Sequence, residues 1–283
     1  GEHQYGQRLI RGDWLAFRCV PSIMKIADRM SRVVSSPTIQ VGLEAARLRR
    51  QGIDVVDLGA GEPDFATPAH VKTAGIDAIA GDFTKYTANA GIPELREAIC
   101  EHYKMAYGVQ YDPDNVIVSA GGKQALFNLV MALFGPGDEV ITHAPGWPTI
   151  VEQIKLADAE PVIVRTRTEE GFKVRAGAVL EALTARTRGV IITSPGNPTG
   201  ALIAEDDLIL IADAAAARGI WVIVDLCYEQ LIYDDASHNL PRVLREHLGE
   251  RGIVAGSLSK SYAMTGWRCG WAIGAAPVIA ACN

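Results

Sequence analysis

The sequence has few cysteines, and their spacing suits neither a metal site nor a disulfide framework. The five cysteines among 283 residues are scattered and form no C-x-x-C pair, which fits a reducing cytosol. No apolar run approaches the roughly 20 residues that a membrane-spanning helix needs. The segment from Trp14 to Val20 is too short for a signal peptide and carries Arg18. We therefore expect a cytoplasmic α/β protein that contacts no membrane.

The chain also lacks an excess of positive charge. Its 27 Lys and Arg residues are outnumbered by 33 Asp and Glu residues, for a net charge of −6. A protein that binds nucleic acid usually carries a basic patch or stripe, so we expect no nucleic-acid partner. Internal repeats, low-complexity tracts and Pro/Ser-rich linkers are absent as well. The apolar content of 48% is ample for a large core.

Short apolar segments alternate with amphipathic ones along most of the chain. A first helix follows the start signal at residues 35–38 and ends at 49–52. Further helices are expected over residues 69–80, 92–107, 123–134, 150–157, 176–185 and 205–218. Strands are expected over 53–58, 116–119, 140–143, 161–165, 190–193, 220–225, 253–257 and 270–274. This alternation predicts an α/β fold, a three-layer α-β-α arrangement with a mainly parallel sheet covered on both faces.

The residues that stand out chemically come directly after expected strands. They are Gly122, Asn197, Asp225, Ser257 and Lys260. Right-handed crossovers bring the carboxyl ends of parallel strands to one edge of the sheet, where open α/β sheets bind their ligands. A single site built from these residues is therefore expected at that edge.

The stretch from Gly256 to Trp271 contains a lysine suited to covalent chemistry. Lys260 lies among small hydroxyl residues just after a strand. A buried lysine amine forms Schiff bases with aldehydes. Ser257 and Arg268 supply hydrogen-bond donors suited to a phosphate. An aldehyde cofactor with a phosphate, such as pyridoxal phosphate, would satisfy all three residues; taken alone, the stretch also fits a surface lysine in a serine-rich turn.

A second phosphate signal lies at Gly121, Gly122 and Lys123, between an expected strand and a helix. Backbone amides at a helix N-terminus point outward and favour anions. The spacing differs from that of a Walker loop. By itself this pair of glycines is as well explained by a tight turn, but together with Ser257 and Arg268 it completes an anion cup.

Four further side chains suit the ring of such a cofactor. Asp225 ends a buried strand, where a carboxylate needs a partner such as a pyridinium nitrogen, although an ordinary cap would also explain it. Tyr228 can hydrogen-bond a phenolate oxygen. Asn197 lies in a rigid Pro- and Gly-rich loop that favours cis peptide bonds. Trp147, at a strand exit, could stack on a flat ring or simply pack.

The motifs together resemble a known family. The chain is similar to class I aminotransferases of the fold-type-I pyridoxal phosphate superfamily, and most of all to the prokaryotic aspartate aminotransferase subgroup. The resemblance extends from Ser31 to about Pro277. It rests on LGAGEPDFATP, KYTANAGIPELREAI, SAGGKQALFNLV, PGNPTG, WVIVDLCYEQLIYD and SLSKSYAMTGWRCGW. The combination of SLSKxYxMTGWRxGW with PGNPTG is highly specific, whereas GGK alone is not.

The resemblance implies a role for each matched residue. Lys260 would carry the cofactor as a Schiff base and shuttle the substrate proton. Asp225 would pair with the ring nitrogen, Tyr228 and Asn197 with the phenolate oxygen, and Trp147 would stack on the ring. The phosphate would be bound by Gly121, Gly122, Ser257 and Arg268, and by Tyr86 from the neighbouring subunit of a homodimer; Lys123 would also be a cofactor-binding residue. The substrate would contact Gly61, Trp147, Asn197, Thr38 and Lys123.

The resemblance also implies a domain organisation. Residues 1–30 would be a leader outside the fold. Residues 31–66 would belong to a small domain, and residues 67–283 would form the cofactor-binding large domain. The C-terminal part of the small domain, with the arginine that grips the substrate α-carboxylate, would be absent, so the chain reads as C-terminally truncated.

The implied reaction is transamination between an amino acid, aspartate or glutamate, and a 2-oxo acid. An alternative on the same fold is a pyridoxal-phosphate-dependent C–S lyase or a related elimination. A third reading, the non-catalytic aminotransferase-like sensor domain of a transcription regulator, would need a basic winged-helix module before the domain. Residues 1–60 are too short and unsuited for one.

Overall fold

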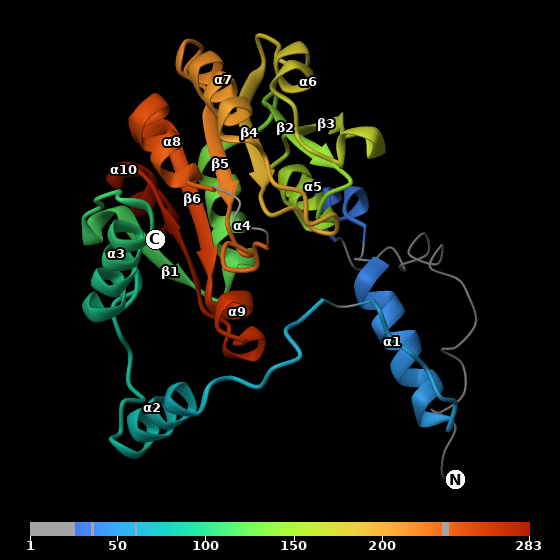
Figure 1. Cartoon of the computed structure of the whole chain (residues 1–283), viewed down its shortest axis with the longest axis vertical. Helices are drawn as coiled ribbons and strands as arrows, with labels where there is room; N and C mark the ends of the chain where they lie inside the picture. The colour runs from blue at the N-terminus through green and yellow to red at the C-terminus, as the bar shows by residue number, and fades with distance from the viewer. Residues whose placement is uncertain (1–25, 35–36, 60, 234–237) are drawn as a thin grey trace.

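A seven-stranded mixed sheet forms the centre of the molecule in the computed structural model (Figure 1). The structure describes residues 26–34, 37–59, 61–233 and 238–283. The strands run in the order β1-β7-β6-β5-β4-β2-β3. Their bounds are β1 Val116–Ser119, β2 Glu139–Ala144, β3 Glu160–Arg165, β4 Thr187–Thr193, β5 Trp221–Asp225, β6 Gly252–Ser257 and β7 Gly270–Ile273. Strand β7 is antiparallel to both of its neighbours, and the other pairs are parallel.

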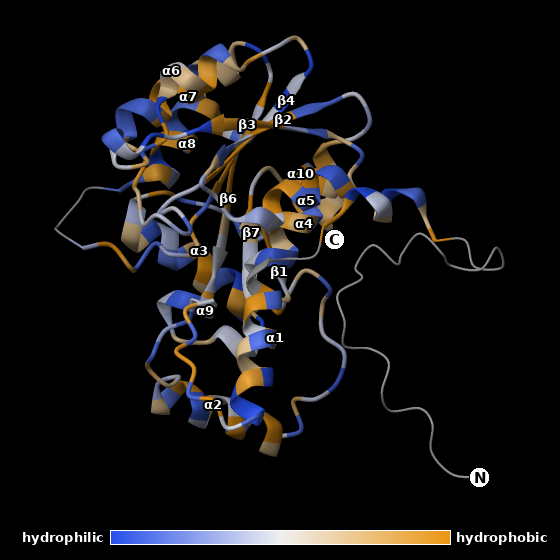
Figure 2. Ribbon diagram, turned by 90° about the vertical axis from the view of Figure 1, so that its right-hand side faces the viewer, coloured by the Kyte–Doolittle hydropathy of each residue, from blue (hydrophilic) through white to orange (hydrophobic). Residues whose placement is uncertain are grey.

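Helices cover both faces of the sheet, which confirms the expected three-layer α/β fold. One face carries α3 (Pro93–Tyr107), α6 (Ala176–Glu181), α7 (Glu205–Ala216) and α8 (Leu240–Leu248); the other carries α4 (Gly122–Leu133), α5 (Pro148–Leu156) and α10 (Ala276–Cys282). Side chains alternate across each strand: Val222 and Val224 face the first layer, and Ile223 faces the second. The strands are accordingly apolar on both faces, and Figure 2 shows the hydrophobic colour on helices α4 and α10 that pack against them.

Two differences from the expected elements have clear physical causes. The apolar run Ile53–Leu58 is not a strand, so that prediction is wrong. The run lies away from the sheet, where it has no ladder partner, and the side chains of Val56 and Leu58 are 83% and 92% exposed. Helix α8 was not predicted. It begins at the Asn239 cap with a proline in its first turn, and its amphipathic pattern spans only Leu240–Leu248.

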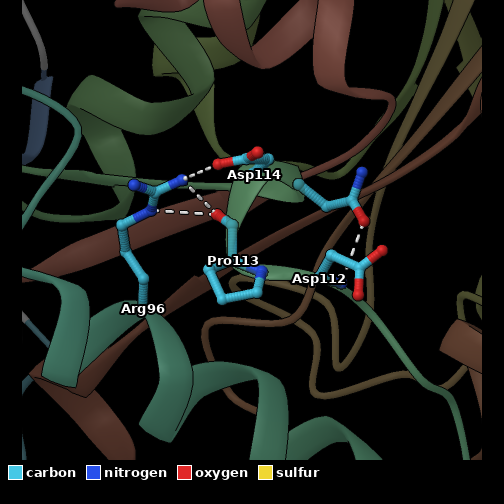
Figure 3. A network of polar contacts seen from close by, with 5 residues as sticks. Arg96, Asp112, Pro113 and Asp114 are labelled. Carbon is cyan, nitrogen blue, oxygen red and sulfur yellow. Dashed lines mark hydrogen bonds and ion pairs between the residues drawn. The ribbon is translucent and has the colours of Figure 1, made fainter.

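A polar network fixes the start of β1 against α3 (Figure 3). The guanidinium of Arg96 donates from Nε to the carbonyl of Pro113 at 2.9 Å and from Nη2 to Asp114 at 3.0 Å. Pro113 opens the short helical turn η3 (Pro113–Asn115) that leads directly into β1. The network therefore ties the strand that ends at Ser119 to the helix layer beside it.

The segments before α3 lie largely outside the sandwich. Helix α1 (Pro37–Arg50) and helix α2 (Ala69–Ala80) stand apart from the sheet (Figure 1). Helix α2 has no buried residue and meets the body where Gly75 approaches the ring of Trp267. The short turn η2 (Asp28–Arg32) reaches α5, where Arg32 pairs with Asp158. The expected leader falls mostly on residues 1–25, which lie outside the described part of the chain.

Neither a membrane span nor a metal cluster is found in the described ranges. None of their helices has the length and apolarity needed to cross a bilayer. They also contain no group of three or more His, Cys, Asp or Glu side chains arranged to hold a metal ion.

Candidate active site

The predicted site residues meet at the carboxyl edge of the sheet because of the pairing around Gly270. Gly270 starts β7 and is paired with Ser119, the last residue of β1, on one side and with Ser257, the last residue of β6, on the other. A Cβ atom at Gly270 would lie 2.3 Å from the backbone nitrogen of Gly122. Only glycine permits this approach. The glycine turn that opens α4 is thus pressed against the stretch that carries Lys260.

The residues of the expected anion cup lie together at this junction. Gly121 caps α4 with a φ of 88°, and a Cβ atom there would lie 2.4 Å from Nη2 of Arg268. The Arg268 guanidinium is held by the carbonyls of Thr265 at 2.9 Å and Ala120 at 3.2 Å. The Ser119 hydroxyl is buried beside the turn and has no hydrogen-bond partner among the described residues. Amides of a helix start, a guanidinium and an unused hydroxyl together suit a phosphate.

Ser257 is buried next to the cup, but its hydroxyl is engaged by its own turn. The oxygen accepts from the amide of Ser259 at 3.0 Å and donates to the carbonyl of Cys269 at 3.3 Å. A Cβ atom at Gly122 would lie 3.4 Å from Cβ of Ser257, so the two residues are in contact.

Asp225 is a buried carboxylate with no cationic partner in the part of the chain that the structure describes. The residue is 4% exposed. Its oxygens accept from the amide of Cys227 at 3.0 Å and from the hydroxyl of Thr193 at 3.5 Å. Burial outweighs these two bonds and raises the pKa of Asp225 to about 6. The bond to Cys227 is the local capping bond that the alternative interpretation predicts, yet it leaves the desolvated charge uncompensated.

Tyr228, Asn197 and Lys260 come together in front of Asp225. The Asn197 amide donates to the Tyr228 hydroxyl at 3.0 Å. The Lys260 amine lies 5.8 Å from the centre of the Tyr228 ring and donates to the carbonyl of Gly61. Burial raises the pKa of Tyr228 to about 12, so its phenol stays protonated and able to donate. The loop of Asn197 has cis peptide bonds before Pro195 and Pro198, as its composition predicted.

Trp147 and Lys123 lie at the same edge, on neighbouring helices. Trp147 caps α5 and is half-buried, and the Lys123 amine lies 5.2 Å from the centre of its ring. This is the geometry of a cation–π contact. The two residues therefore contact one another in the absence of a ligand.

Two further predicted site residues have no printed contact with this cluster in the described part of the chain. Tyr86 lies in the link between α2 and α3, and its side chain is fully exposed. Thr38 lies in α1, but its side chain falls outside the described residues.

His143 adjoins the cluster through Thr193 and was not predicted. It is buried within β2, where its Nε2 accepts from the amide of Thr193 at 3.3 Å and its Nδ1 lies 3.1 Å from the carbonyl of Pro145. Burial lowers the pKa of His143, so the ring is neutral at physiological pH. Thr193 in turn contacts Asp225, which connects the histidine to the carboxylate. A polar residue at the end of an otherwise apolar strand was the available signal.

Comparison with known proteins identifies the family. The profile described as "Aminotransferase class I and II" matches residues 53–283, which is most of the chain. The chain belongs to this family. It is 42% identical over 256 residues to the aspartate/prephenate aminotransferase of Thermus thermophilus, an alignment that covers 90% of this chain and 66% of that protein. To the aspartate aminotransferase of Bacillus sp. YM-2 it is 39% identical over 254 residues, covering 90% and 65%.

A solved structure agrees with the fold of this chain. The aspartate aminotransferase of Thermus thermophilus, solved with maleate, superposes with a TM-score of 0.88 at 41% identity, covering 92% of this chain and 67% of that one. The chain spans 62% to 66% of the length of the curated relatives that it matches. Aminotransferases of this family use pyridoxal 5′-phosphate, which confirms the cofactor that the sequence predicted.

Proposed function

We propose that this aminotransferase transfers an amino group between an amino acid, aspartate or glutamate, and a 2-oxo acid. The carboxylate of Asp225 is the observation that carries the proposal. It is buried at the bottom of the site, its pKa is raised to about 6, and no cation among the described residues compensates it. A protonated pyridine nitrogen placed against it would supply that cation.

The residues at the sheet edge fit pyridoxal phosphate as a set. Lys260 would hold its aldehyde carbon as a Schiff base, Asp225 its ring nitrogen, and Tyr228 with Asn197 its phenolate oxygen. Trp147 would lie on its ring. The phosphate would be bound by Gly121, Gly122, Lys123, Ser257 and Arg268, and the unpartnered hydroxyl of Ser119 adds a donor.

Catalysis then depends on how these side chains hold charge and protons. When bound, the cofactor supplies an electron sink that acidifies the Cα–H bond of the amino acid. The carboxylate of Asp225 keeps the ring nitrogen protonated, which preserves that sink. The amine of Lys260, held at the edge by the Gly61 carbonyl, is placed to take the proton from Cα and return it as general base and acid.

The proposed substrate carries a second carboxylate. Lys123 has its amine over the Trp147 ring, at the mouth of the site. It would meet the distal carboxylate together with Thr38, while Gly61 and Asn197 would contact the α-carboxylate. The related Thermus thermophilus enzyme was solved with maleate, a dicarboxylate, which supports this choice of substrate class.

We also propose that the protein works as a cytoplasmic homodimer. The side chain of Tyr86 is fully exposed on its own chain, so it would act in the neighbouring site, on the phosphate. Exposed apolar side chains on and beside α2, such as Phe65, Ile76 and Ile79, support a partner on this side. Residues 31–66 would belong to a small domain, and residues 67–283 would form the large domain. Helix α1, which stands apart from the sheet, supports this division (Figure 1).

Borohydride trapping tests the proposed function. The protein mixed with pyridoxal phosphate should show a visible absorbance band that borohydride abolishes, leaving a pyridoxyl group on the Lys260 peptide. Lys260→Ala should lose the label and the transamination of aspartate with 2-oxoglutarate. A label on another lysine, or product formed from cystathionine instead of aspartate, would contradict the proposal.

A further inference from the structure

Glu229 is a buried carboxylate that follows Tyr228 directly and points away from the site. Its side chain is 3% exposed. It accepts a hydrogen bond from the Tyr107 hydroxyl at 2.6 Å and lies 3.3 Å from Nε2 of His102. Both partners belong to α3. Adjacent residues of one turn thus face opposite ways, Tyr228 toward the lysine and Glu229 toward the helix layer.

The position of Glu229 is narrowly defined by these two contacts. A buried carboxylate is costly unless donors satisfy it, so any movement that breaks either bond is strongly unfavourable. The Glu229 hydrogen bond raises the pKa of His102, which favours a ring that donates to the carboxylate. Burial and the nearby Glu229 charge raise the pKa of Tyr107, which keeps its hydroxyl a donor.

The helix that supplies these donors is itself held firmly. The ring of Tyr103 packs edge-on against His102 at 5.3 Å and against Trp271 of β7 at 6.5 Å between centroids. The Trp271 indole donates to the Tyr103 hydroxyl at 3.2 Å. Because β7 is part of the sheet that carries the site, these contacts fix the position of α3 relative to the site.

The turn between Asp225 and Glu229 leaves Tyr228 little freedom of its own. The Glu229 amide donates to the carbonyl of Leu226 at 2.9 Å, and the Leu231 amide donates to the carbonyl of Tyr228 at 2.8 Å. At its start, the turn is fixed by the end of β5. At its far end, Glu229 is the side chain that attaches it to α3. The Tyr228 hydroxyl accepts from Asn197, so its own hydrogen is available to a ligand.

We propose that Glu229 is a positioning residue that acts through Tyr228. By gripping Tyr107 and His102 of α3, it fixes the direction in which the Tyr228 hydroxyl donates to the phenolate oxygen of the cofactor. This inference rests on the proposed function. It assigns a role in the site to a carboxylate, a histidine and a tyrosine that touch neither cofactor nor substrate.

The absorbance titration of the bound cofactor reports this role directly. A donor to the phenolate oxygen stabilises the deprotonated chromophore and lowers its pKa. Glu229→Ala should release Tyr228 and raise the midpoint of the titration by about one pH unit, a tenfold change in proton affinity. Loss of the negative charge alone would move the midpoint the other way, because an anion nearby favours the protonated form. The sign therefore separates positioning from simple electrostatics.

Glu229→Gln is the conservative variant, because its amide can still pair with Tyr107 and His102. It should leave the midpoint unchanged or slightly lowered. Tyr107→Phe removes one donor and should shift it upward by less than Glu229→Ala does. Tyr103→Phe is the matched control: it removes a buried hydrogen bond of the same helix that does not involve Glu229. It should lower thermal stability without moving the midpoint.

Hydrogen exchange in the cofactor-free protein gives a second readout. The Leu231 amide, bonded to the Tyr228 carbonyl, should exchange faster in Glu229→Ala and Tyr107→Phe than in Tyr103→Phe. The charge of Glu229 also acts on Tyr103, Cys227 and His238, so the titrations are run with each variant over the same pH range.

The outcomes separate this inference from the proposed function. A wild-type protein that gives no visible band with pyridoxal phosphate would refute the proposed function. A normal wild-type band whose midpoint is unchanged or lowered in Glu229→Ala, with the same result in Tyr107→Phe, would overturn the role of Glu229 alone. If Glu229→Ala does not fold, the Tyr107→Phe titration and exchange decide.

Discussion

Replacing Asp225 with Asn should stabilise the cofactor-free protein. Burial raises the pKa of this carboxyl from an ordinary 3.8 to about 6, so keeping it ionised at neutral pH costs the folded state about 3 kcal/mol. The amide avoids this cost. It can still accept from the Cys227 amide and can donate to the Thr193 hydroxyl oxygen, the two contacts that Asp225 makes.

The sign and the pH window follow from the raised pKa. The folded protein holds this proton more tightly than the unfolded chain does. The contribution of the Asp225 carboxyl to the free energy of unfolding is therefore fully present below the ordinary carboxyl pKa. It is lost as the pH rises through about 6. Asp225→Asn should gain about 3 kcal/mol over wild type at pH 8 and about 1.5 kcal/mol at pH 5.

Urea unfolding of both proteins, stripped of cofactor, measures this difference. Asp54→Asn, a change at an exposed carboxylate, is the control and should stay within about 0.5 kcal/mol of wild type at both pH values. The same Asp225→Asn change should weaken pyridoxal phosphate binding by roughly 10- to 150-fold, because a buried charge-assisted bond of about 1.5–3 kcal/mol is lost. An apo variant no more stable than wild type at pH 8 would refute the reasoning.

Three further changes test other parts of the site. Gly270→Ala places a methyl group 2.3 Å from the Gly122 nitrogen. It should lower the free energy of thermal unfolding by about 1–3 kcal/mol and weaken cofactor binding. The control Gly266→Ala, whose methyl group meets nothing within 4 Å, should change neither quantity. Arg268→Lys loses the fork that spans Ala120 and Thr265 and should weaken pyridoxal phosphate about tenfold while leaving the affinity for phosphate-free pyridoxal unchanged. Burial lowers the pKa of His238 to about 4, so its contribution to stability is present above about pH 6.5 and is lost as the pH falls toward 4; His238→Gln should flatten that part of a melting-temperature profile, and an unchanged slope would argue against the buried neutral ring.

The sequence predicted the sheet well because strand positions are encoded locally. Each of the seven strands overlaps an expected apolar segment, and helices α4, α5, α6 and α7 begin within a few residues of their expected starts. The direction of β7 was not predictable in this way. It depends on how the chain from Ser257 to Gly270 returns to the same edge, and neither periodicity nor composition reports that path. The run Ile53–Leu58, wrongly predicted as a strand, has the apolar residues of a strand but no adjacent strand to pair with.

The sequence predicted the site residues whose role depends on their own chemical type. It missed residues whose role depends on which other residues lie next to them in the fold. Lys260, Asp225, Asn197 and Tyr228 follow strands, and the fold brings them to one edge as expected. His143 and Glu229 were missed because their roles come from the elements that they face, Thr193 on β4 and the donors of α3. These contacts join residues far apart in the sequence, and a single sequence contains no local mark of them.

The pairing of Gly270 with Ser257 makes the segment between them a closed loop with both ends at one point of the sheet. Lys260 and Arg268 both lie on this loop. An added or deleted residue within 258–269 would leave the flanking strands in register, yet it would re-aim the amine and the guanidinium together. The protein should therefore tolerate length changes here as a folded molecule while losing its chemistry. Insertions at this loop would separate folding from function more cleanly than most point substitutions.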